Sequence, residues 1–229
     1  METFYINPEN KAEQEKGKME TVIFNENNIG KTVEKIKKFG KKLGAGNYGT
    51  VLTLPDSSNY CVKINRVNSG DENDPIEELD FMEVGKDIGV KIPTPRALVI
   101  DGEGKNRDIY TFMDTVDGLS LQDIMESDSL EKIPANFDFF DFFEKLEADL
   151  KKLNEVIYHR DIKPENILLD HDGGHWIIDF GQSKWVKDLR LNENATFEGD
   201  IKNFRNTKII FANFLKGKGM DLKKTKQHS

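Results

Sequence analysis

Residues 159–166 read His-Arg-Asp-Ile-Lys-Pro-Glu-Asn, and an Asp-Phe-Gly motif follows at residues 179–181. A third motif, Gly-Ala-Gly-Asn-Tyr-Gly-Thr-Val, precedes them at residues 44–51. Glycines let a backbone approach phosphates closely and adopt unusual dihedral angles, so the third motif alone is typical of many phosphate-binding loops. Each short motif can arise by chance, whereas the ordered set of three cannot plausibly do so.

The sequence around the glycine-rich motif distinguishes between classes of phosphate-binding loop. A dinucleotide-binding loop leads into a helix, whereas residues 51–54, Val-Leu-Thr-Leu, are typical of a strand. A second candidate, Gly30-Lys31-Thr32, lacks the glycine that a P-loop needs five residues earlier, because position 25 is Asn. The sequence therefore favours a glycine-rich hairpin between two strands.

Short apolar runs and helical periodicity divide the chain into two halves. The first half contains predicted strands at 51–54, 60–64, 97–100 and 108–113, and one predicted helix from Pro75 to about Ile88. After Gly118, helices are predicted at 139–153 and 200–215, with a strand pair at 167–169 and 176–178. The pattern predicts an α+β chain with a strand-rich first half and a helix-rich second half.

Composition excludes several classes of protein. The chain has 229 residues, a formal charge of −8 and one cysteine, so a disulfide framework and a thiolate zinc cluster are excluded. No run approaches the ~20 apolar residues of a membrane span, and the acidic balance argues against a nucleic-acid binder. The N-terminus lacks the basic start and apolar stretch of a secretory signal. We therefore expect a soluble, cytosolic protein.

The three motifs together resemble those of protein kinases of the eukaryotic Ser/Thr type. The resemblance covers about residues 39–215 and implies a bilobal fold, with a small antiparallel-sheet N-lobe carrying one helix and a reduced helical C-lobe. The expected domains are a polar N-terminal arm at 1–37, a kinase domain at 38–215 and a Lys-rich tail at 216–229. Within the kinase domain, the N-lobe would span 38–113, the hinge 114–118 and the C-lobe 119–215. The arm is interpreted either as flexible or as a short docking strand.

The resemblance also implies ATP and Mg²⁺ as cofactors and gives each motif residue a role. Asp161 would be the catalytic base and Lys163 would contact the transferred phosphate, whereas Asn166 and Asp179 would hold Mg²⁺ through oxygen atoms. Lys63 would neutralise the α- and β-phosphates. The residues expected to bind the nucleotide are Gly44, Gly46, Gly49, Val51, Cys61, Lys63, the gatekeeper Met113, the backbones of Asp114 and Val116, and Leu168.

Lys63 requires a carboxylate partner on the following helix, where Glu77, Glu78 and Glu83 are all candidates. Glu78 has Phe81 and Met82 three and four residues later, so all three side chains can share an inward face. We therefore expect Glu78 to be the catalytic residue that pairs with Lys63, and Glu77 and Glu83 to be solvated.

Two further motif residues have alternative interpretations. His159 fits a proton relay less well than a structural role, because this family uses that histidine to pack and hydrogen-bond the loop. Cys61 occupies the place of a small residue above the adenine, so we expect it to be a packing residue and not a nucleophile.

The second half of the chain departs from the family pattern. Only 48 residues follow Gly181, and no Ala-Pro-Glu sequence ends an activation segment. Asp200 can begin the long central helix, whose aspartate anchors the catalytic loop in the family. The sequence in this respect resembles the minimal kinases among bacterial secreted effectors, and also the compact atypical kinases. It predicts a docking or activating partner in place of the missing C-lobe helices. Arg160 would pair with a phosphorylated loop residue, for which Ser183 and Thr196 are the candidates; the alternative is a loop that is always active without phosphorylation.

These observations predict ATP- and Mg²⁺-dependent phosphorylation of Ser/Thr hydroxyls on a protein substrate. Lys163 favours a protein substrate, because small-molecule kinases of related fold usually lack this lysine. The alternatives are a pseudokinase-like binding scaffold and a small-molecule kinase. An effector would in addition be secreted into a host cell.

Overall fold

Two compact units make up the chain in the computed structural model, which describes residues 2–6, 26–46, 49–55, 57–67, 75–103, 106–188 and 197–222. The first unit consists of Met1–Glu83 and Thr94–Thr115. The second unit consists of Val84–Pro93 and Val116–Ser229. The division after Thr115 falls within the segment 114–118 that the sequence suggests as a hinge.

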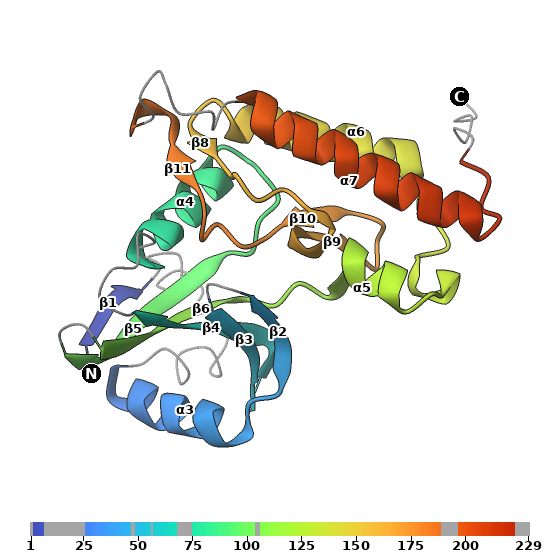
Figure 1. The fold of residues 1–229 in the computed structure, drawn as a ribbon. Coiled ribbons are helices and arrows are strands. Elements are labelled where there is room, and N and C mark those ends of the chain that lie inside the picture. Colours follow the sequence, from blue (N-terminus) through green and yellow to red (C-terminus); the bar gives the residue numbers. More distant parts are fainter. Residues whose placement is uncertain are drawn as a thin grey trace. The chain divides into compact units, whose positions relative to one another are not determined.

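The first unit is built on a six-stranded antiparallel sheet with the strand order β1-β5-β6-β4-β3-β2 (Figure 1). Its strands are β1 (Glu2–Ile6), β2 (Lys42–Gly46), β3 (Gly49–Leu54), β4 (Ser57–Val67), β5 (Pro95–Glu103) and β6 (Asn106–Asp114). Strands β3 to β6 contain all four of the runs predicted from the sequence. The central strands are rich in β-branched and aromatic residues, which suit a pleated, half-buried surface.

A helix packs against each face of this sheet. On one face, Val33 and Ile36 of α3 (Glu26–Phe39) are each 1% exposed and join a core with Val62 and Phe112. On the other face, Leu79 of α4 (Pro75–Asp87) packs with Leu98, Ile100 and Ile109. The first unit is therefore a sheet between two helices.

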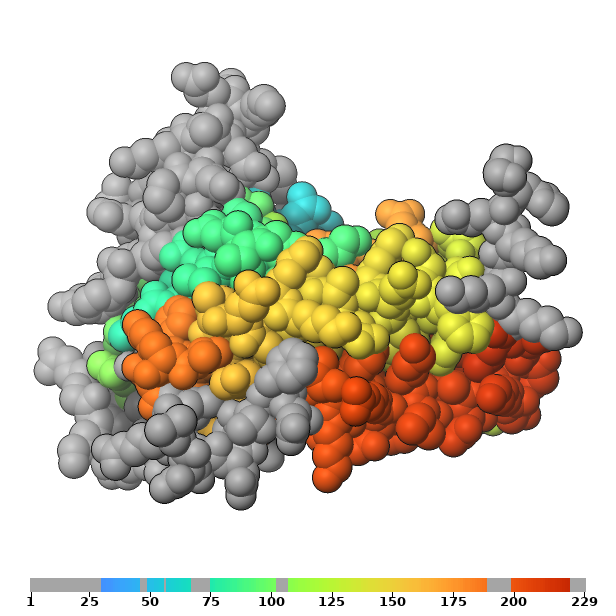
Figure 2. Space-filling model, turned by 90° about the horizontal axis from the view of Figure 1, so that it is seen from above, coloured from blue at the N-terminus to red at the C-terminus, as the bar shows by residue number. Residues whose placement is uncertain are grey.

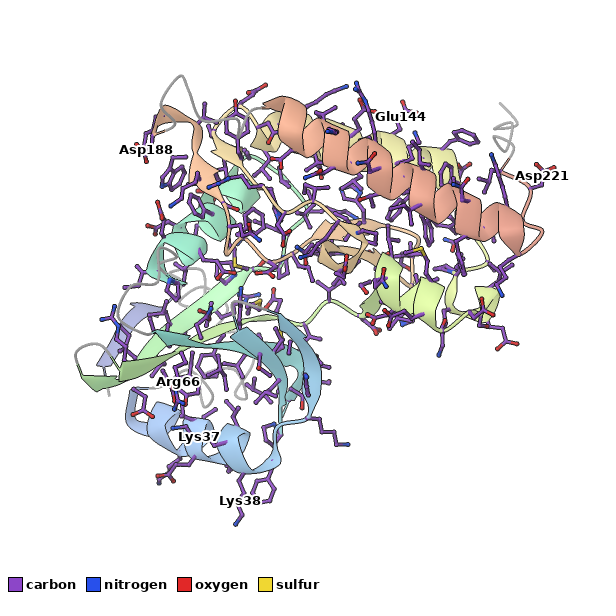
Figure 3. All side chains as sticks on the ribbon, viewed as in Figure 1. Lys37, Lys38, Arg66, Glu144, Asp188 and Asp221 are labelled. Carbon is purple, nitrogen blue, oxygen red and sulfur yellow. The ribbon has the colours of Figure 1, made fainter. Side chains whose placement is uncertain are left out.

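Strand β1 agrees with the docking strand that the sequence left open at residues 1–37, whereas helix α3 differs from the polar arm expected there. β1 adds a sixth strand beside β5, and α3 brings a second helix to the sheet. Lys37 of α3 extends to the sheet, where its Nζ atom lies 2.9 Å from Asp101 Oδ2 (Figure 3). Two buried apolar positions three residues apart give only a weak helical signal, so the polar composition dominated the sequence interpretation. The expected arm also contains a short apolar run, Val-Ile-Phe at residues 22–24, which lies outside the described residues.

Replacing Ile36 with Ala is expected to lower the free energy of unfolding by about 3 kcal/mol, because it leaves a cavity between α3 and the sheet. Phe39 ends the same helix but is 59% exposed, so Phe39→Ala should change stability by no more than about 0.5 kcal/mol. Urea denaturation of the two variants measures the difference. Equal effects would contradict the packing of α3 on the sheet.

The second unit is mainly helical. Its helices are α5 (Leu121–Glu126), α6 (Phe139–Leu153) and α7 (Phe197–Gly217), with 3-10 turns η1 (Leu130–Lys132), η2 (Pro164–Asn166) and η3 (Val186–Asp188). The predicted helices at 139–153 and 200–215 are thus confirmed. Figure 2 shows α6, in yellow, lying along α7, in red.

Aromatic side chains fill the contact between α6 and α7. The ring of Phe143 on α6 lies 6.0 Å from the ring of Phe204 and 6.3 Å from the ring of Phe211, both on α7. All three are buried. Asp138 begins α6 as its N-cap, because its Oδ1 atom accepts hydrogen bonds from the backbone N–H groups of Phe140 and Asp141. The phenylalanine periodicity read from the sequence is therefore the core-facing side of α6.

Two small antiparallel sheets carry the motif segments of the second unit. One has the order β10-β9-β7, from β7 (Gly118–Ser120), β9 (Ile167–Asp170) and β10 (His175–Ile177). The other pairs β8 (Ile157–Tyr158) with β11 (Lys184–Trp185). The α+β prediction, with an antiparallel sheet first and helices second, is confirmed. None of the helices within the described part of the chain is long and apolar enough to cross a membrane.

Candidate active site

The glycine-rich motif forms the hairpin between β2 and β3, where Gly46 pairs with Gly49. Gly49 has a φ of 153°, and a Cβ there would lie 2.7 Å from the carbonyl oxygen of Ile64, so the hairpin requires glycine. No described atom lies within 4 Å of a Cβ built at Gly44, so packing does not require glycine at this position. The motif joins two strands as expected, and Gly44 leaves room for a ligand. Asn47 and Tyr48, at the hairpin turn, lie outside the described residues.

Strand register brings four predicted nucleotide-binding side chains to one face of the sheet. Val51 of β3 pairs with Lys63 of β4, and Cys61 of β4 pairs with Met113 of β6. Because alternate residues of a strand share a face, these four side chains lie on the same side as Ile109, which packs against α4. A base requires apolar surface with few polar groups, which Val51, Cys61 and Met113 can supply.

Lys63 and Glu78 form a buried ion pair on this face of the first unit. Lys63 Nζ lies 2.6 Å from Glu78 Oε1, and their side chains are 7% and 8% exposed. Phe81 and Met82, the residues used to single out Glu78, are 2% and 3% exposed. The structure therefore gives Lys63 the carboxylate partner that the sequence favoured.

Cys61 is buried, with its Sγ atom 3.8 Å from the carbonyl oxygen of Asp114. Burial raises the pKa of the Cys61 thiol to about 11, because a thiolate would be poorly solvated there. A thiol with this pKa is a poor nucleophile at neutral pH. The geometry supports its interpretation as a packing residue.

The raised pKa predicts slow alkylation of Cys61 in the folded protein. At pH 8, about one buried thiol in a thousand is ionised, against about a quarter of the thiols in an unfolded chain. Iodoacetamide should therefore modify the protein about 250-fold more slowly in buffer than in denaturant. Since Cys61 is the sole cysteine, the gain in mass reports it directly. Equal rates in the two solvents would contradict the burial of this thiol.

The end of β6 is held by an arginine that the sequence analysis did not identify. Arg96 Nε and Nη2 lie 2.7 and 2.9 Å from the two carboxylate oxygens of Asp114. The backbone N–H of Asp114 donates to the carbonyl oxygen of Thr94 at 3.0 Å. The N–H of Asp114 is therefore already bonded, so its carbonyl oxygen is the backbone group that can accept a bond from adenine. The other two predicted adenine contacts, Val116 and Leu168, are half-buried residues of the second unit.

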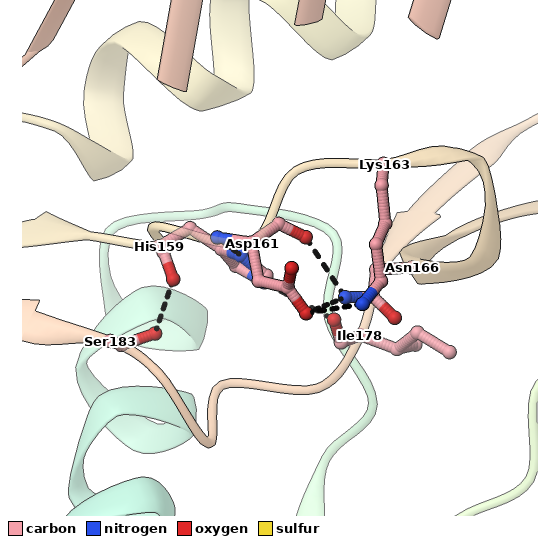
Figure 4. A network of polar contacts seen from close by, with 6 residues as sticks. All are labelled: His159, Asp161, Lys163, Asn166, Ile178 and Ser183. Atoms are coloured by element: carbon pink, nitrogen blue, oxygen red, sulfur yellow. Dashed lines mark hydrogen bonds and ion pairs between the residues drawn. The ribbon is translucent and has the colours of Figure 1, made fainter. Parts of the chain in front are cut away.

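Asp161, Lys163 and Asn166 form a polar cluster in the second unit (Figure 4). Lys163 Nζ lies 2.7 Å from Asp161 Oδ2, and Asn166 Nδ2 donates to the same oxygen at 2.9 Å. Asn166 Nδ2 also donates to the Asp161 carbonyl oxygen at 2.9 Å. Burial would lower the pKa of Lys163, but the hydrogen bond that Lys163 donates to Asp161, with the negative charge of that carboxylate, outweighs burial and raises this pKa, so the ammonium stays charged. The cluster fixes one carboxylate oxygen between two donors.

The imidazole ring of His159 is neutral, and each of its two nitrogens forms a hydrogen bond. Its Nδ1 atom accepts the N–H of Asp161 at 3.3 Å, so Nε2 carries the proton and donates to the carbonyl oxygen of Ile178 at 3.1 Å. Complete burial lowers the pKa of His159, which keeps the ring uncharged. The ring also lies edge-on, 4.8 Å from Phe180. These contacts support a structural role, since both nitrogens are occupied and no proton is left to relay.

Asp200, in the first turn of α7, anchors the backbone of the loop that begins at His159. Its Oδ2 and Oδ1 atoms accept the N–H groups of His159 and Arg160, each at 2.8 Å. Arg160 and Asp179 both have a φ of 66°, an unusual backbone conformation for residues other than glycine. Such conformations persist only where surrounding contacts impose them, as the Asp200 carboxylate does at Arg160. The anchoring aspartate expected from the family resemblance is therefore present.

The residues proposed to hold magnesium fit a hard cation. Asn166 uses its Nδ2 atom in the two bonds to Asp161, which leaves the amide oxygen to face a metal. Asp179 follows Ile178, whose N–H donates to the carbonyl oxygen of Asn166 at 3.0 Å, so the two residues are linked. Within the described residues, no group of three His, Cys, Asp or Glu side chains could hold a metal. Two oxygen ligands therefore suit a cation that takes its remaining ligands from phosphates and water.

The two candidate phosphorylation sites differ in accessibility. Ser183 is 3% exposed, and its hydroxyl donates to the carbonyl oxygen of His159 at 3.4 Å. A kinase could reach this hydroxyl only after the segment had opened. Thr196 lies outside the described residues. The structure therefore argues against Ser183 as a phosphate acceptor in the folded chain.

Comparison with known proteins identifies relatives of this chain. Residues 37–208 match the family described as "Protein kinase domain". Cyclin-dependent kinase 7 of Carassius auratus is 28% identical over 185 residues, which are 79% of this chain and 52% of that protein. Serine/threonine-protein kinase cst-1 of Caenorhabditis briggsae is 29% identical over 175 residues, which are 73% of this chain and 33% of that protein. Ribosomal protein S6 kinase 2 alpha of Gallus gallus is 29% identical over 151 residues, which are 63% of this chain and 19% of that protein. The chain spans about half the length of these relatives or less.

Proposed function

Because the chain belongs to the protein kinase domain family, we propose that it transfers the γ-phosphoryl group of ATP to Ser/Thr hydroxyls of a protein substrate. The observation that carries this proposal is the Asp161–Lys163–Asn166 cluster, in which one carboxylate oxygen is held by two donors. The Lys63–Glu78 ion pair supports it, since a passive scaffold needs neither a buried lysine nor its partner.

In the proposed reaction, each residue aligns groups or neutralises charge. ATP would supply the transferred phosphoryl group, and its bound Mg²⁺ would offset the negative charge on the phosphate oxygens. Asp161 orients the attacking hydroxyl and accepts its proton, and the Lys163 ammonium faces the transferred phosphate. Lys63 neutralises the other phosphates, and Glu78 fixes the position of its ammonium group. Asn166 and Asp179 present oxygen atoms to Mg²⁺.

The destination of the label from radiolabelled ATP tests this proposal against its alternatives. The purified chain is incubated with Mg²⁺, a mixture of acceptor proteins and a pool of small metabolites. We expect label in protein, released by acid hydrolysis as phosphoserine or phosphothreonine. Label confined to the metabolites would instead identify a small-molecule kinase. Thermal stabilisation by Mg-ATP without transfer would indicate a binding scaffold.

The docking partner predicted from the sequence is also a proposal, for which α7 offers a surface. Ile209 and Ile210 are 57% and 47% exposed, and Lys202 and Arg205 lie on the same exposed side. Residues 201–220 contain no Asp or Glu, so an acidic segment with apolar side chains fits best. A photo-crosslinker at position 209 should capture a protein that the chain phosphorylates. The same photo-crosslinker at the exposed Glu144 of α6 should not capture this protein (Figure 3).

Similarity to secreted bacterial effector kinases, and hence delivery into a host cell, is proposed from the sequence alone. Phosphoproteomics of cells that express the wild type or Asp161→Ala would identify the substrates and show whether they are host proteins. Host proteins phosphorylated only by the wild type would support an effector role. An unchanged host phosphoproteome would count against it.

A further inference from the structure

Asp149 is a buried carboxylate of α6 that none of the kinase motifs includes. It is 7% exposed, and three donors surround it. Its Oδ2 atom accepts the Nε2–H of the buried His175 at 3.0 Å and the backbone N–H of Lys91 at 3.2 Å. Its Oδ1 atom accepts Lys152 Nζ at 3.1 Å. A buried charge with this many bonds needs an explanation, because burying it is costly.

Asp149 is ionised at neutral pH. Burial favours the protonated carboxyl, but the bonds from His175, the Lys91 backbone and Lys152 outweigh it and lower the pKa of Asp149 to about 2. The carboxylate thus acts as a fixed acceptor for groups from two other segments. Those segments are β10 and the residues that follow α4.

The contacts of Asp149 fix the outer edge of strand β10. One edge of β10 pairs with β9, where His175 lies opposite Leu169 and Ile177 opposite Ile167. At the other edge, the backbone N–H of Ile177 donates to the carbonyl oxygen of Lys91 at 2.9 Å. Asp149 contacts both sides of this second edge. It accepts the side-chain N–H of His175 on β10 and the backbone N–H of Lys91, the residue that pairs with Ile177.

Strand β10 leads directly into the proposed metal ligands. The next residue, Ile178, donates its N–H to Asn166 and accepts the Nε2–H of His159 through its carbonyl oxygen. Asp179 follows, in its unusual backbone conformation with a φ of 66°. A shift of β10 would therefore move Asp179 relative to Asn166.

We propose that Asp149 is a positioning residue that sets the spacing of Asn166 and Asp179 through His175, Lys91 and strand β10. The proposal rests on the proposed kinase function, because it assumes that these two residues hold magnesium. Asp149 touches neither ATP nor substrate in this account. Groups outside the ligand shell of a metal commonly change its affinity by tenfold or more when they are removed.

The Mg²⁺ dependence of phosphoryl transfer tests the proposal in the full chain at saturating ATP. Asp149→Asn should raise the Mg²⁺ concentration for half-maximal activity by about tenfold. The matched control is Asp141→Asn on the same helix, because Asp141 is exposed and forms a surface ion pair with Lys145. The control should behave as the wild type does.

A second pair of variants separates positioning from simple loss of stability. His175→Gln can still donate a hydrogen bond to Asp149, whereas His175→Leu cannot. We expect His175→Gln to need less Mg²⁺ than His175→Leu, even if both variants melt at a lower temperature. These variants also keep the test decisive if Asp149→Asn does not fold.

Amide hydrogen exchange gives a readout that does not depend on activity. In Asp149→Asn, the amides of Ile177 and Ile178 should exchange faster, whereas those of Phe204 and Phe211 in α7 should keep their wild-type rates. Unchanged Mg²⁺ dependence together with unchanged exchange at these two isoleucines would overturn the proposal and leave Asp149 a purely stabilising residue. If the wild type transfers no phosphate, the kinase function fails instead, and the exchange rates still test the positioning of β10.

Discussion

Lys63→Met is expected to lower the rate of phosphoryl transfer by about 100- to 1,000-fold, because it removes a preorganised positive charge from the phosphates. The same change should destabilise the fold by about 3 kcal/mol or more. Glu78 would be left as a buried carboxylate without its 2.6 Å partner, and its side chain is only 8% exposed. Activity and thermal denaturation of the purified variant measure the two effects.

The double variant Lys63→Met/Glu78→Gln separates these two consequences. Neutralising Glu78 removes the uncompensated charge, so the melting temperature should return most of the way to that of the wild type. Activity should stay as low as in the single variant, because the phosphates still lack their cation. Recovery of activity along with stability would show that Lys63 serves only the fold.

Asp161→Asn is expected to lower the turnover number by about 100- to 10,000-fold, with a small change in stability. Asparagine retains an oxygen that can accept one of the bonds from Lys163 and Asn166, but it cannot accept a proton from the substrate. The KM for ATP should change little, because Asp161 is assigned to the hydroxyl and not to the nucleotide. Steady-state kinetics at saturating Mg²⁺ measure both constants.

The control for this variant is Asp188→Asn. Asp188 is an exposed aspartate of the same unit, at the end of η3 (Figure 3). It should retain wild-type turnover, so any loss specific to Asp161 reflects the position of that carboxylate. Equal turnover for Asp161→Asn and Asp188→Asn would remove Asp161 from the mechanism.

Short-range patterns predicted much of the candidate site. Glu78 could be chosen over its neighbours because Phe81 and Met82 recur at helical spacing and place all three side chains inward. The face shared by Val51 and Lys63 follows from the two-residue period of a strand once the pairing is known. In both cases, residues close in sequence determine the direction of the side chain.

Contacts between distant segments could not be predicted in the same way. Arg96 holds Asp114 from 18 residues away, and Asp149 receives the N–H of Lys91 across 58 residues. Neither residue belongs to a motif, and an isolated Asp or Arg in a sequence usually indicates an exposed position. Their roles appear only when the fold has brought the partners together.

The N-terminal region shows a further limit of sequence patterns. Helix α3 contributes Val33 and Ile36 to the core but is otherwise rich in Lys, Glu and Asn. Its stability comes from packing against the sheet more than from the composition of the helix. Composition therefore indicated a polar arm where the structure has a helix with a narrow buried face.

Incorporation of phosphate from radiolabelled ATP into protein serine or threonine tests the central claim most directly. The wild type and Asp161→Asn, purified identically, are compared with the same acceptor proteins, first with Mg²⁺ and then with excess EDTA. We predict incorporation by the wild type that requires Mg²⁺ and falls at least about 100-fold in Asp161→Asn. Equal incorporation by the two proteins, or wild-type incorporation that persists in EDTA, would contradict the account.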